Sequence, residues 1–298
     1  MAQKSLNEGL WLRAAFMKGS RTETVWISCP LKFLSPLFSA HMYLPTRSIM
    51  SLSLSMRNDS QLLCVASTDK EKYKLEVKDI FLNLKYATYH DQVKDRWETA
   101  IDANGLRRNV QCDRTSYFVM KEKSTSARFQ SIFSFSVTPC VLICYSLTEK
   151  TFIGNYSANR YSFQNPGVKS IQIFKNSIGH SENSNTTSMN IKKNSKHHLY
   201  WYKQFLSVFG SPSHDIQPDQ FLDDMFLMCW NMTVSPTVEN EPLIGLDSQN
   251  LRLSPIDAGS IDVTIELENA TTENLVVFFL GFFQQEIVFD KNGVPDMS

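Results

Sequence analysis

The residues near the C-terminus constrain the fold most, because their side chains alternate strictly between apolar and polar. In residues 261–268 the apolar set and the polar set interleave: Ile261, Val263, Ile265 and Leu267 with Asp262, Thr264, Glu266 and Glu268. A period of two predicts a β-strand with one buried face and one solvated face. Turn-forming residues 269–274 follow, and then residues 275–280 form a continuous apolar run, which predicts a strand covered on both faces. A shorter strand is predicted at 284–289, with a hairpin turn at 290–293. Strands this close together predict one antiparallel sheet in a β-rich chain.

Earlier parts of the chain repeat the alternating pattern. Residues 50–56 alternate between apolar residues and serines, which predicts a strand. In residues 73–86 the alternation slips by one residue at Asp79, as expected for a strand with a β-bulge. Further predicted strands lie at 109–120, 131–147, 168–174 and 226–232, with another within 25–38 and the start of the closing sheet at 251–253.

Two stretches change to a helical period. In residues 91–104 the apolar side chains recur at intervals of three and four, with Asp91 as the expected N-cap and Gly105 as the C-terminal stop. Residues 199–209 show the same spacing, and Gly210 and Pro212 end that helix. Both helices are predicted to be insertions between strands.

Bulk composition narrows the class of protein. Thirty basic and thirty acidic residues give a net charge of zero, which argues against a basic nucleic-acid-binding surface. No apolar run reaches the length of a membrane helix, and charged residues interrupt the N-terminal region where a secretion signal would lie. The six cysteines lie scattered among apolar residues, as buried free thiols in a reducing compartment do. We therefore expect an intracellular protein that is not secreted.

The histidines and cysteines are the first candidates for metal ligands. His197 and His198, with His180 and His214, lack the spacing of a structural zinc site, so a solvated helix start is expected for the doublet. Cys140 and Cys144 lie four apart in a predicted strand, share a face, and are expected in the core.

Two charged pairs complete the set of candidates. Asp223 and Asp224 can be paired carboxylates, but their place directly before a strand favours a solvated turn. Arg107 and Arg108 can hold an anion or a partner carboxylate, but their place in a turn before a strand favours a structural salt bridge. We predict no catalytic residue, no cofactor-binding residue and no metal ligand.

The order of these elements resembles the double jelly-roll capsid-like proteins of Polinton (Maverick) elements and related DNA viruses, of the adenovirus hexon lineage. The resemblance runs from Gly9 to Pro295 and is carried by short patterns in sequence order rather than by one motif. These include Tyr43-Leu-Pro45, the stretch 73–79, Leu106-Arg-Arg108, Asn155-Tyr156, Phe163-Gln-Asn165, 206–210, Trp230-Asn-Met-Thr233, 250–253 and 286–292. The start of the family's first jelly roll is absent, and residues 179–196 are more polar than in the family. The resemblance implies a major-capsid-like subunit that forms homotrimers, binds other capsid proteins and lies in the virion.

The resulting prediction is an all-β fold: residues 73–298 form a jelly-roll β-sandwich of the viral capsid type with two short inserted helices. Residues 1–72 are then the remnant of a first jelly roll. The predicted function is structural, without catalysis, cofactor, membrane contact or specific nucleic-acid contact. A monomeric β-sandwich binding module remains an alternative, with ligand held by loops 154–167 and 179–194. An enzyme on a cupin-like jelly roll is a third possibility, but it needs histidine and glutamate ligands on inner strands.

Overall fold

The computed structural model describes residues 28, 51, 53–62, 74, 76–83, 87–133, 138–175, 178–179, 195–209, 216–232, 259–289 and 295–297.

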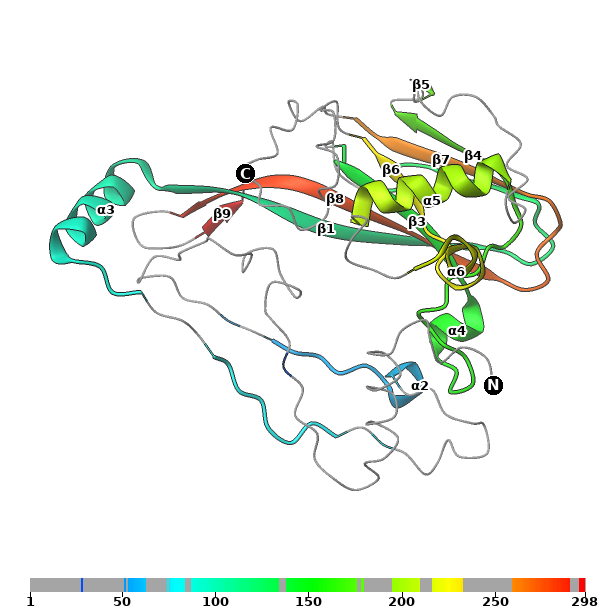
Figure 1. The fold of residues 1–298 in the computed structure, drawn as a ribbon, viewed down its shortest axis with the longest axis horizontal. Helices are drawn as coiled ribbons and strands as arrows, with labels where there is room; N and C mark the ends of the chain where they lie inside the picture. Colours follow the sequence, from blue (N-terminus) through cyan, green and yellow to red (C-terminus); the bar gives the residue numbers. More distant parts are fainter. Residues whose placement is uncertain are drawn as a thin grey trace.

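Two antiparallel sheets form the body of the protein (Figure 1). Sheet A contains, in spatial order, β1 (Leu106–Met120), β8 (Leu275–Phe289), β3 (Val141–Thr148) and β6 (Met228–Asn231). The short strand β9 (Pro295–Met297) also pairs with β8. Sheet B contains, in spatial order, β2 (Ser126–Phe129), β7 (Ile261–Leu267), β4 (Val168–Lys175) and β5 (Ile178–Gly179).

The strand pairing is nested. The first strand pairs with the eighth, the second with the seventh, the third with the sixth and the fourth with the fifth. The pairs β3–β8 and β4–β7 then join these ribbons into two sheets. Eight antiparallel strands connected in this way form a jelly roll, so the predicted fold class is confirmed.

The main core lies between the two sheets and is rich in aromatic rings. Phe118 of β1 and Phe279 of β8 both contact Phe129 of β2, with ring centroids 5.3 and 5.4 Å apart. Val263 of β7 and Phe279 are fully buried in the same cluster. Because burial of a large apolar side chain contributes about 1.5–3 kcal/mol, this interlayer contact holds the sheets together.

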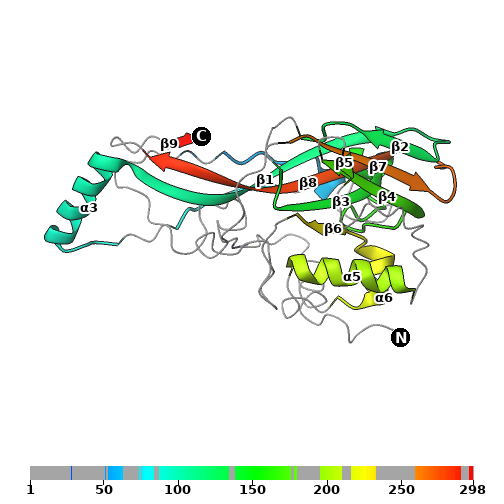
Figure 2. The same ribbon diagram turned by 90° about the horizontal axis from the view of Figure 1, so that it is seen from above.

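Helices lie against the sandwich and at the end of the ribbon that extends from it. Helices α5 (Lys196–Phe209) and α6 (Pro218–Asp224) follow β5, and Trp201 of α5 packs edge-on against Trp230 of β6 at 5.1 Å. At the far end of the long β1–β8 ribbon lies α3 (Asp91–Asn104), as Figure 2 shows. Two short helices, α2 (Asp59–Leu62) and α4 (Glu149–Ile153), lie beside each other below the sandwich in Figure 1.

The predicted helix at 91–104 is confirmed with its stop at Gly105, whose N–H donates to the Ile101 carbonyl at a φ of 67°. Asp91 is the first helical residue rather than the N-cap; that position belongs to His90, whose side chain makes no capping hydrogen bond. The second predicted helix begins three residues earlier than expected, at Lys196.

The strands predicted at 50–56 and 73–86 are wrong for the residues that the structure describes there. Residues 51, 53–58, 74 and 76–83 lie in no strand. Their apolar side chains are exposed, for example Leu54 at 53% and Phe81 at 72%. An alternating pattern becomes a strand only where a neighbour supplies backbone hydrogen bonds, and no sheet partner reaches these residues within the described part of the chain. The boundary at residue 72 remains a prediction.

The C-terminal strands differ from the prediction in two ways. Residues 275–289 form one strand rather than two, because Gly281 continues the strand instead of breaking it. The strands β7 and β8 lie in opposite sheets, because residues 268–274 cross from one sheet to the other. The predicted turn at 290–293 lies outside the described residues.

The middle of the chain also differs from the prediction. Of the described residues in the stretch predicted as a strand at 131–147, residues 131–133 and 138–140 lie outside any strand, and β3 begins at Val141. The short strand β2 was not predicted. The strands predicted at 109–120, 168–174 and 226–232 are present, the last as the four-residue β6.

Candidate functional site

The outer face of sheet A carries a cluster of aromatic rings, which we call the aromatic cluster: Tyr117, Tyr145, Phe152, Phe163 and Phe278. Tyr145 stacks on Phe278 with centroids 4.9 Å apart and planes 6° apart, and it contacts Phe163 at 4.7 Å. Tyr117 contacts Phe152 at 5.5 Å and Phe278 at 6.0 Å. Although Phe278 points away from the main core, it is only 6% exposed. The sequence therefore builds a second, smaller apolar layer outside the sandwich.

Helix α4 supplies Phe152 to this layer and is fixed by polar contacts at its start. Thr148 caps the helix, its hydroxyl oxygen accepting from the Thr151 N–H at 3.3 Å. Asn274 donates through its side-chain amide to the Glu149 carboxylate at 2.8 Å, and the Glu149 N–H donates to the Asn274 carbonyl at 3.0 Å. These contacts join the end of β3 to the turn before β8.

Helix α2 contacts the C-terminal end of α4 through hydrogen bonds. The Gln61 side-chain amide donates to the carbonyls of Phe152 and Ile153 at 3.2 and 3.0 Å. These carbonyls lie in the last turn of α4, which has no further helical N–H to bond them. Residues 59–62, from the segment interpreted as a remnant, thus pack onto the sandwich.

The hydroxyl of Tyr145 lies in a partly buried, positively charged setting. Burial raises the pKa of Tyr145, and the guanidinium groups of Arg160 and Arg57 partly offset that rise. Arg160 also lies 5.6 Å from the centre of the Phe152 ring.

Beside the aromatic cluster, β1 presents what we call the edge face: Asp113, Thr115, Tyr117, Val119 and Lys121. All five are exposed, including Tyr117 at 57% and Val119 at 50%. The alternate residues of this stretch are less exposed, and Phe118 and Met120 pack in the main core. Strand β1 lies at the end of sheet A, with β8 as its neighbour (Figure 2).

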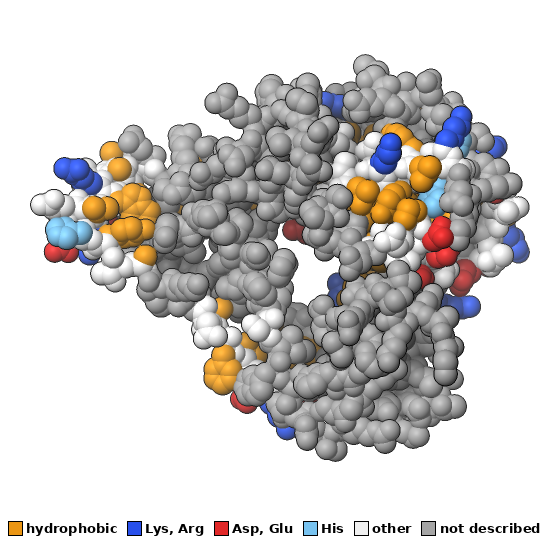
Figure 3. Space-filling model, viewed as in Figure 1, with side chains coloured by type: hydrophobic (Ala, Val, Ile, Leu, Met, Phe, Trp, Pro, Cys, Tyr) orange, Lys and Arg blue, Asp and Glu red, His pale blue; other side chains and the backbone are white. Residues whose placement is uncertain are grey.

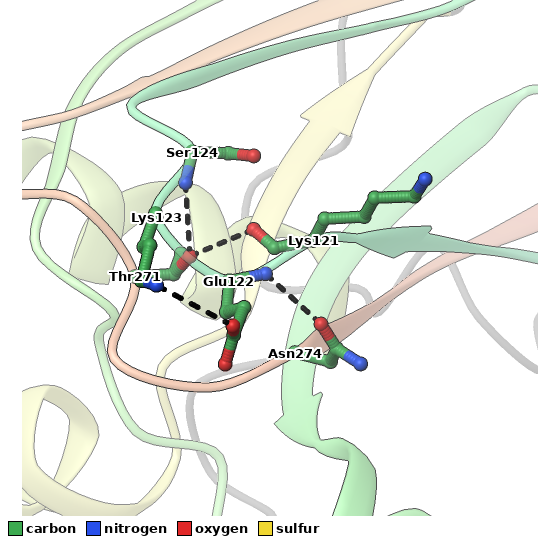
Figure 4. A network of polar contacts seen from close by, with 6 residues as sticks. All are labelled: Lys121, Glu122, Lys123, Ser124, Thr271 and Asn274. Carbon is green, nitrogen blue, oxygen red and sulfur yellow. Dashed lines mark hydrogen bonds and ion pairs between the residues drawn. The ribbon is translucent and has the colours of Figure 1, made fainter.

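A polar network fixes the turn at the end of the edge face (Figure 4). Thr271 donates through its hydroxyl to the Lys121 carbonyl at 2.8 Å, and its own carbonyl accepts from the Lys123 N–H at 2.8 Å. Asn274 accepts from the Glu122 N–H at 2.9 Å. Figure 4 shows the Lys121 side chain extending away from this network. The network therefore fixes the backbone of Lys121 but leaves its ammonium group outside.

The histidine doublet lies at the start of α5, as predicted, but the prediction that it is solvated is wrong for His198. His198 is fully buried, its Nε2 lies 2.7 Å from the Pro218 carbonyl, and its ring lies parallel to that of Phe221. His197 is half-buried. The structure does not describe His180 or His214. Within the described ranges, no three His, Cys, Asp or Glu side chains gather as they would around a metal ion.

None of the cysteines that the structure describes forms a disulfide. Cys144 is fully buried in the core, as predicted, whereas Cys140 is half-buried and precedes β3. Burial raises the pKa of Cys144 and of Cys229, the latter well above its usual value. The pKa of Cys112 is raised by burial as well, although Arg114 opposes that rise.

The two charged pairs lie on different elements. Asp223 and Asp224 end α6 rather than forming a turn before a strand; both are exposed, and Asp224 accepts from the Ser162 hydroxyl at 3.0 Å. Arg107 and Arg108 lie within β1, opposite Val288 and Ile287 of β8, rather than in a turn.

Exposed apolar side chains also lie on the surface of the sandwich, over α5. Figure 3 shows a group of hydrophobic side chains over α5, where Leu199 and Tyr200 are exposed. Of the helices in the described part of the chain, none has the length and apolar character to cross a membrane.

No family model matches this chain, and no curated protein matches it. Among solved structures, the chain is similar to the PBCV-1 virus capsid at 7% identity and a TM-score of 0.37, covering 70% of this chain and 54% of that chain. It is also similar to a protein of the Sputnik virophage at 9% identity and a TM-score of 0.32, covering 64% of this chain and 39% of that one. A third similar structure is the mavirus major capsid protein, at 7% identity and a TM-score of 0.30, covering 65% and 41%. The chain spans 39% to 54% of the length of these proteins.

Proposed function

We propose that this chain is a structural, major-capsid-like subunit that acts by assembling with copies of itself and with other capsid proteins, without catalysis. The observation that carries the proposal is the nested pairing of eight strands into two sheets. A fold alone hosts many functions, so the proposal also rests on the end-to-end sequence resemblance to double jelly-roll capsid-like proteins.

The surface of the sandwich supports a role in assembly. Exposed apolar residues lie on β1 and α4, among them Tyr117, Val119 and Ile153. Contiguous exposed apolar areas mark contact surfaces, and Tyr117 contacts Phe152, which is next to Ile153 in α4. A net charge of zero adds no long-range repulsion between identical subunits.

The finer parts of the proposal follow from the resemblance. Residues 73–298 are the jelly-roll unit, residues 1–72 are the remainder of a preceding one, and three copies form a homotrimer. The protein then lies in the virion when it assembles, and no specific nucleic-acid contact is required.

Native mass spectrometry and light scattering of the purified chain test this function. We expect a species of three times the 34.2 kDa chain mass, and ring- or shell-like particles in electron micrographs at high concentration. A protein that stays monomeric at all concentrations would contradict the proposal and favour the binding-module alternative.

A further inference from the structure

Strand β1 is an edge strand that is longer than most strands of globular proteins. It runs for fifteen residues and pairs with β8 along all of them without a register shift. Its other side faces no further strand in the described part of sheet A. The other strands at sheet edges in the described part of the chain are β6, β2, β5 and β9, which have four, four, two and three residues. Long, regular edges offer unpaired backbone N–H and C=O groups to another chain, and natural proteins usually shorten, bend or charge them.

The edge face is complementary to itself about Tyr117. In an antiparallel pair of two β1 strands centred on Tyr117, Asp113 of one copy lies opposite Lys121 of the other. Thr115 then lies opposite Val119, and Tyr117 lies opposite its own symmetry mate. Residues directly opposite in such a pair share a face and have their Cβ atoms about 5 Å apart. This register therefore places Asp113 of each copy beside Lys121 of the other, and it places no like charges opposite each other.

We propose that two copies of this chain associate through antiparallel pairing of their β1 edges over residues 113–121, with Tyr117 on the two-fold axis. The contact is isologous, so each favourable pair occurs twice. It continues sheet A across the two molecules by strand addition, in which main-chain hydrogen bonds give affinity and alternate side chains give specificity.

The local structure prepares this surface. The long pairing with β8 keeps β1 regular, and the contacts of Thr271 hold the backbone of Lys121 in place. Tyr117 packs on Phe152 and Phe278 of the same copy, so its ring is already held on the outer face of sheet A. In the paired state it would lie there beside the Tyr117 ring of the second copy. The aromatic clusters of the two copies would meet at the axis.

This inference goes beyond the proposed trimer, because a two-fold contact cannot by itself close a ring of three. In a shell the β1 contact would join subunits of neighbouring blocks. The two interfaces can therefore be tested separately.

Charge reversal in the full chain tests the contact. Asp113→Lys places lysines opposite lysines, and Lys121→Asp places aspartates opposite aspartates. Sedimentation equilibrium at low ionic strength should show dimerisation through β1 weakened about tenfold or more in each single variant, because like charges directly opposite destabilise a strand pair. The double variant Asp113→Lys/Lys121→Asp restores both pairs and should dimerise as the original chain does. Lys169→Asp, an exposed reversal on β4 of sheet B, is the matched control and should have no effect.

Hydrogen exchange supplies a second measurement that needs no variant. Within residues 113–121, the amides that do not donate to β8 should become protected as protein concentration rises, whereas the amides of the turn at 122–124 should show no such change. Equal association of all variants, or concentration-independent exchange in β1, would overturn the proposal. Loss of the β1 contact in single variants that still form trimers would support this inference and leave the proposed function intact; β1 dimers without any trimer would contradict the trimer alone.

Discussion

Asp262 shows how one buried side chain fixes the corner between β2 and β7. Its carboxylate accepts from the Ser131 N–H at 2.9 Å and from the Arg128 guanidinium at 3.1 Å, and the residue is 8% exposed. Arg128 is about half exposed, so its charge is largely screened.

We expect Asp262→Ala to lower the free energy of unfolding by about 1–3 kcal/mol, because it leaves the Ser131 N–H without its acceptor. Arg128→Ala, which removes only the exposed partner, should cost less than about 1 kcal/mol. Urea denaturation measures both. Equal losses would show that the ion pair rather than the backbone contact holds the corner.

Gly281 tests the packing of the core. A Cβ atom added there would lie 2.7 Å from Phe133 Cζ and 2.8 Å from Phe283 Cε2. These two rings pack edge to face with centroids 5.1 Å apart. Gly281→Ala should therefore destabilise the protein by about 1–3 kcal/mol through overpacking.

The double variant Gly281→Ala/Phe133→Leu separates steric conflict from a change in strand propensity. If the conflict with Phe133 dominates, the double variant loses less stability than the sum of the two single variants. Simple additivity would contradict this explanation.

The buried thiols predict a pH dependence of stability. Burial raises the pKa of Cys144 and Cys229 above the usual 9.0. Above that pH the folded state keeps these protons while the unfolded state releases them, so stability falls as the pH rises through 9. Unfolding measured between pH 7 and 10 should show a smaller decline in the variant Cys144→Ala/Cys229→Ala, compared at matched starting stability. An unchanged decline would assign the effect to other groups.

His198 shows why the burial of single residues could be predicted only in part from the sequence. Its position at a helix start was predictable from the spacing of 199–209. Its burial depends on the Pro218 carbonyl, which comes from another helix twenty residues later and at 2.7 Å satisfies the ring nitrogen. Helix α6 itself was not predicted, and the aromatic cluster needs Phe152 and Phe278 from segments far apart in the chain.

At the scale of elements, periodicity predicted strands where both a neighbour and a buried face exist. The alternation in 261–267 matches β7, and the apolar run at 275–280 lies in β8. The same period at 76–83 forms no strand, because side-chain alternation does not provide a hydrogen-bonding neighbour. Short strands such as β2 and β5 span too few residues to show a period.

Helix α3 should hold the far end of the β1–β8 ribbon. Its Ile101 and Trp97 pack with Ile287 and Phe289 in a small cluster separate from the main core. Ile101→Ala should release this contact at a local cost of about 2 kcal/mol or more. Hydrogen exchange should then increase at 285–289 while β3 stays protected, because local units open separately. Increased exchange throughout both sheets would show that the ribbon end and the sandwich unfold as one unit; Val93→Ala, on an exposed position of α3, is the control.

For the whole molecule, the order of the strands could not be predicted from periodicity. Periodicity is a local pattern, whereas the pair β1–β8 joins residues as far apart as 106 and 289. Composition and alternation predict a β-sandwich, but many connections satisfy the same pattern. The jelly roll was predicted through the resemblance to capsid-like proteins, which carries strand order as well as strand content.

The role of the N-terminal segment is the remaining question at this scale. Among the described residues, every member of the main core lies between Met120 and Phe283, within residues 73–298. Residues 59–62 add the Gln61 contacts with the end of α4. We therefore expect the fragment 73–298 to fold and unfold cooperatively, with a loss of stability limited to the α2 contact.

Expression of 73–298 beside the full chain tests this expectation. The Gln61 contacts are two hydrogen bonds worth about 0.5–1.5 kcal/mol each, so Gln61→Ala in the full chain should reproduce most of the fragment's loss. Calorimetry and circular dichroism compare the three proteins. An unfolded fragment would show that the boundary at residue 72 is wrong and that the preceding segment is part of the jelly-roll unit. A folded fragment much less stable than Gln61→Ala would show that residues before 73 support the sandwich through contacts beyond α2.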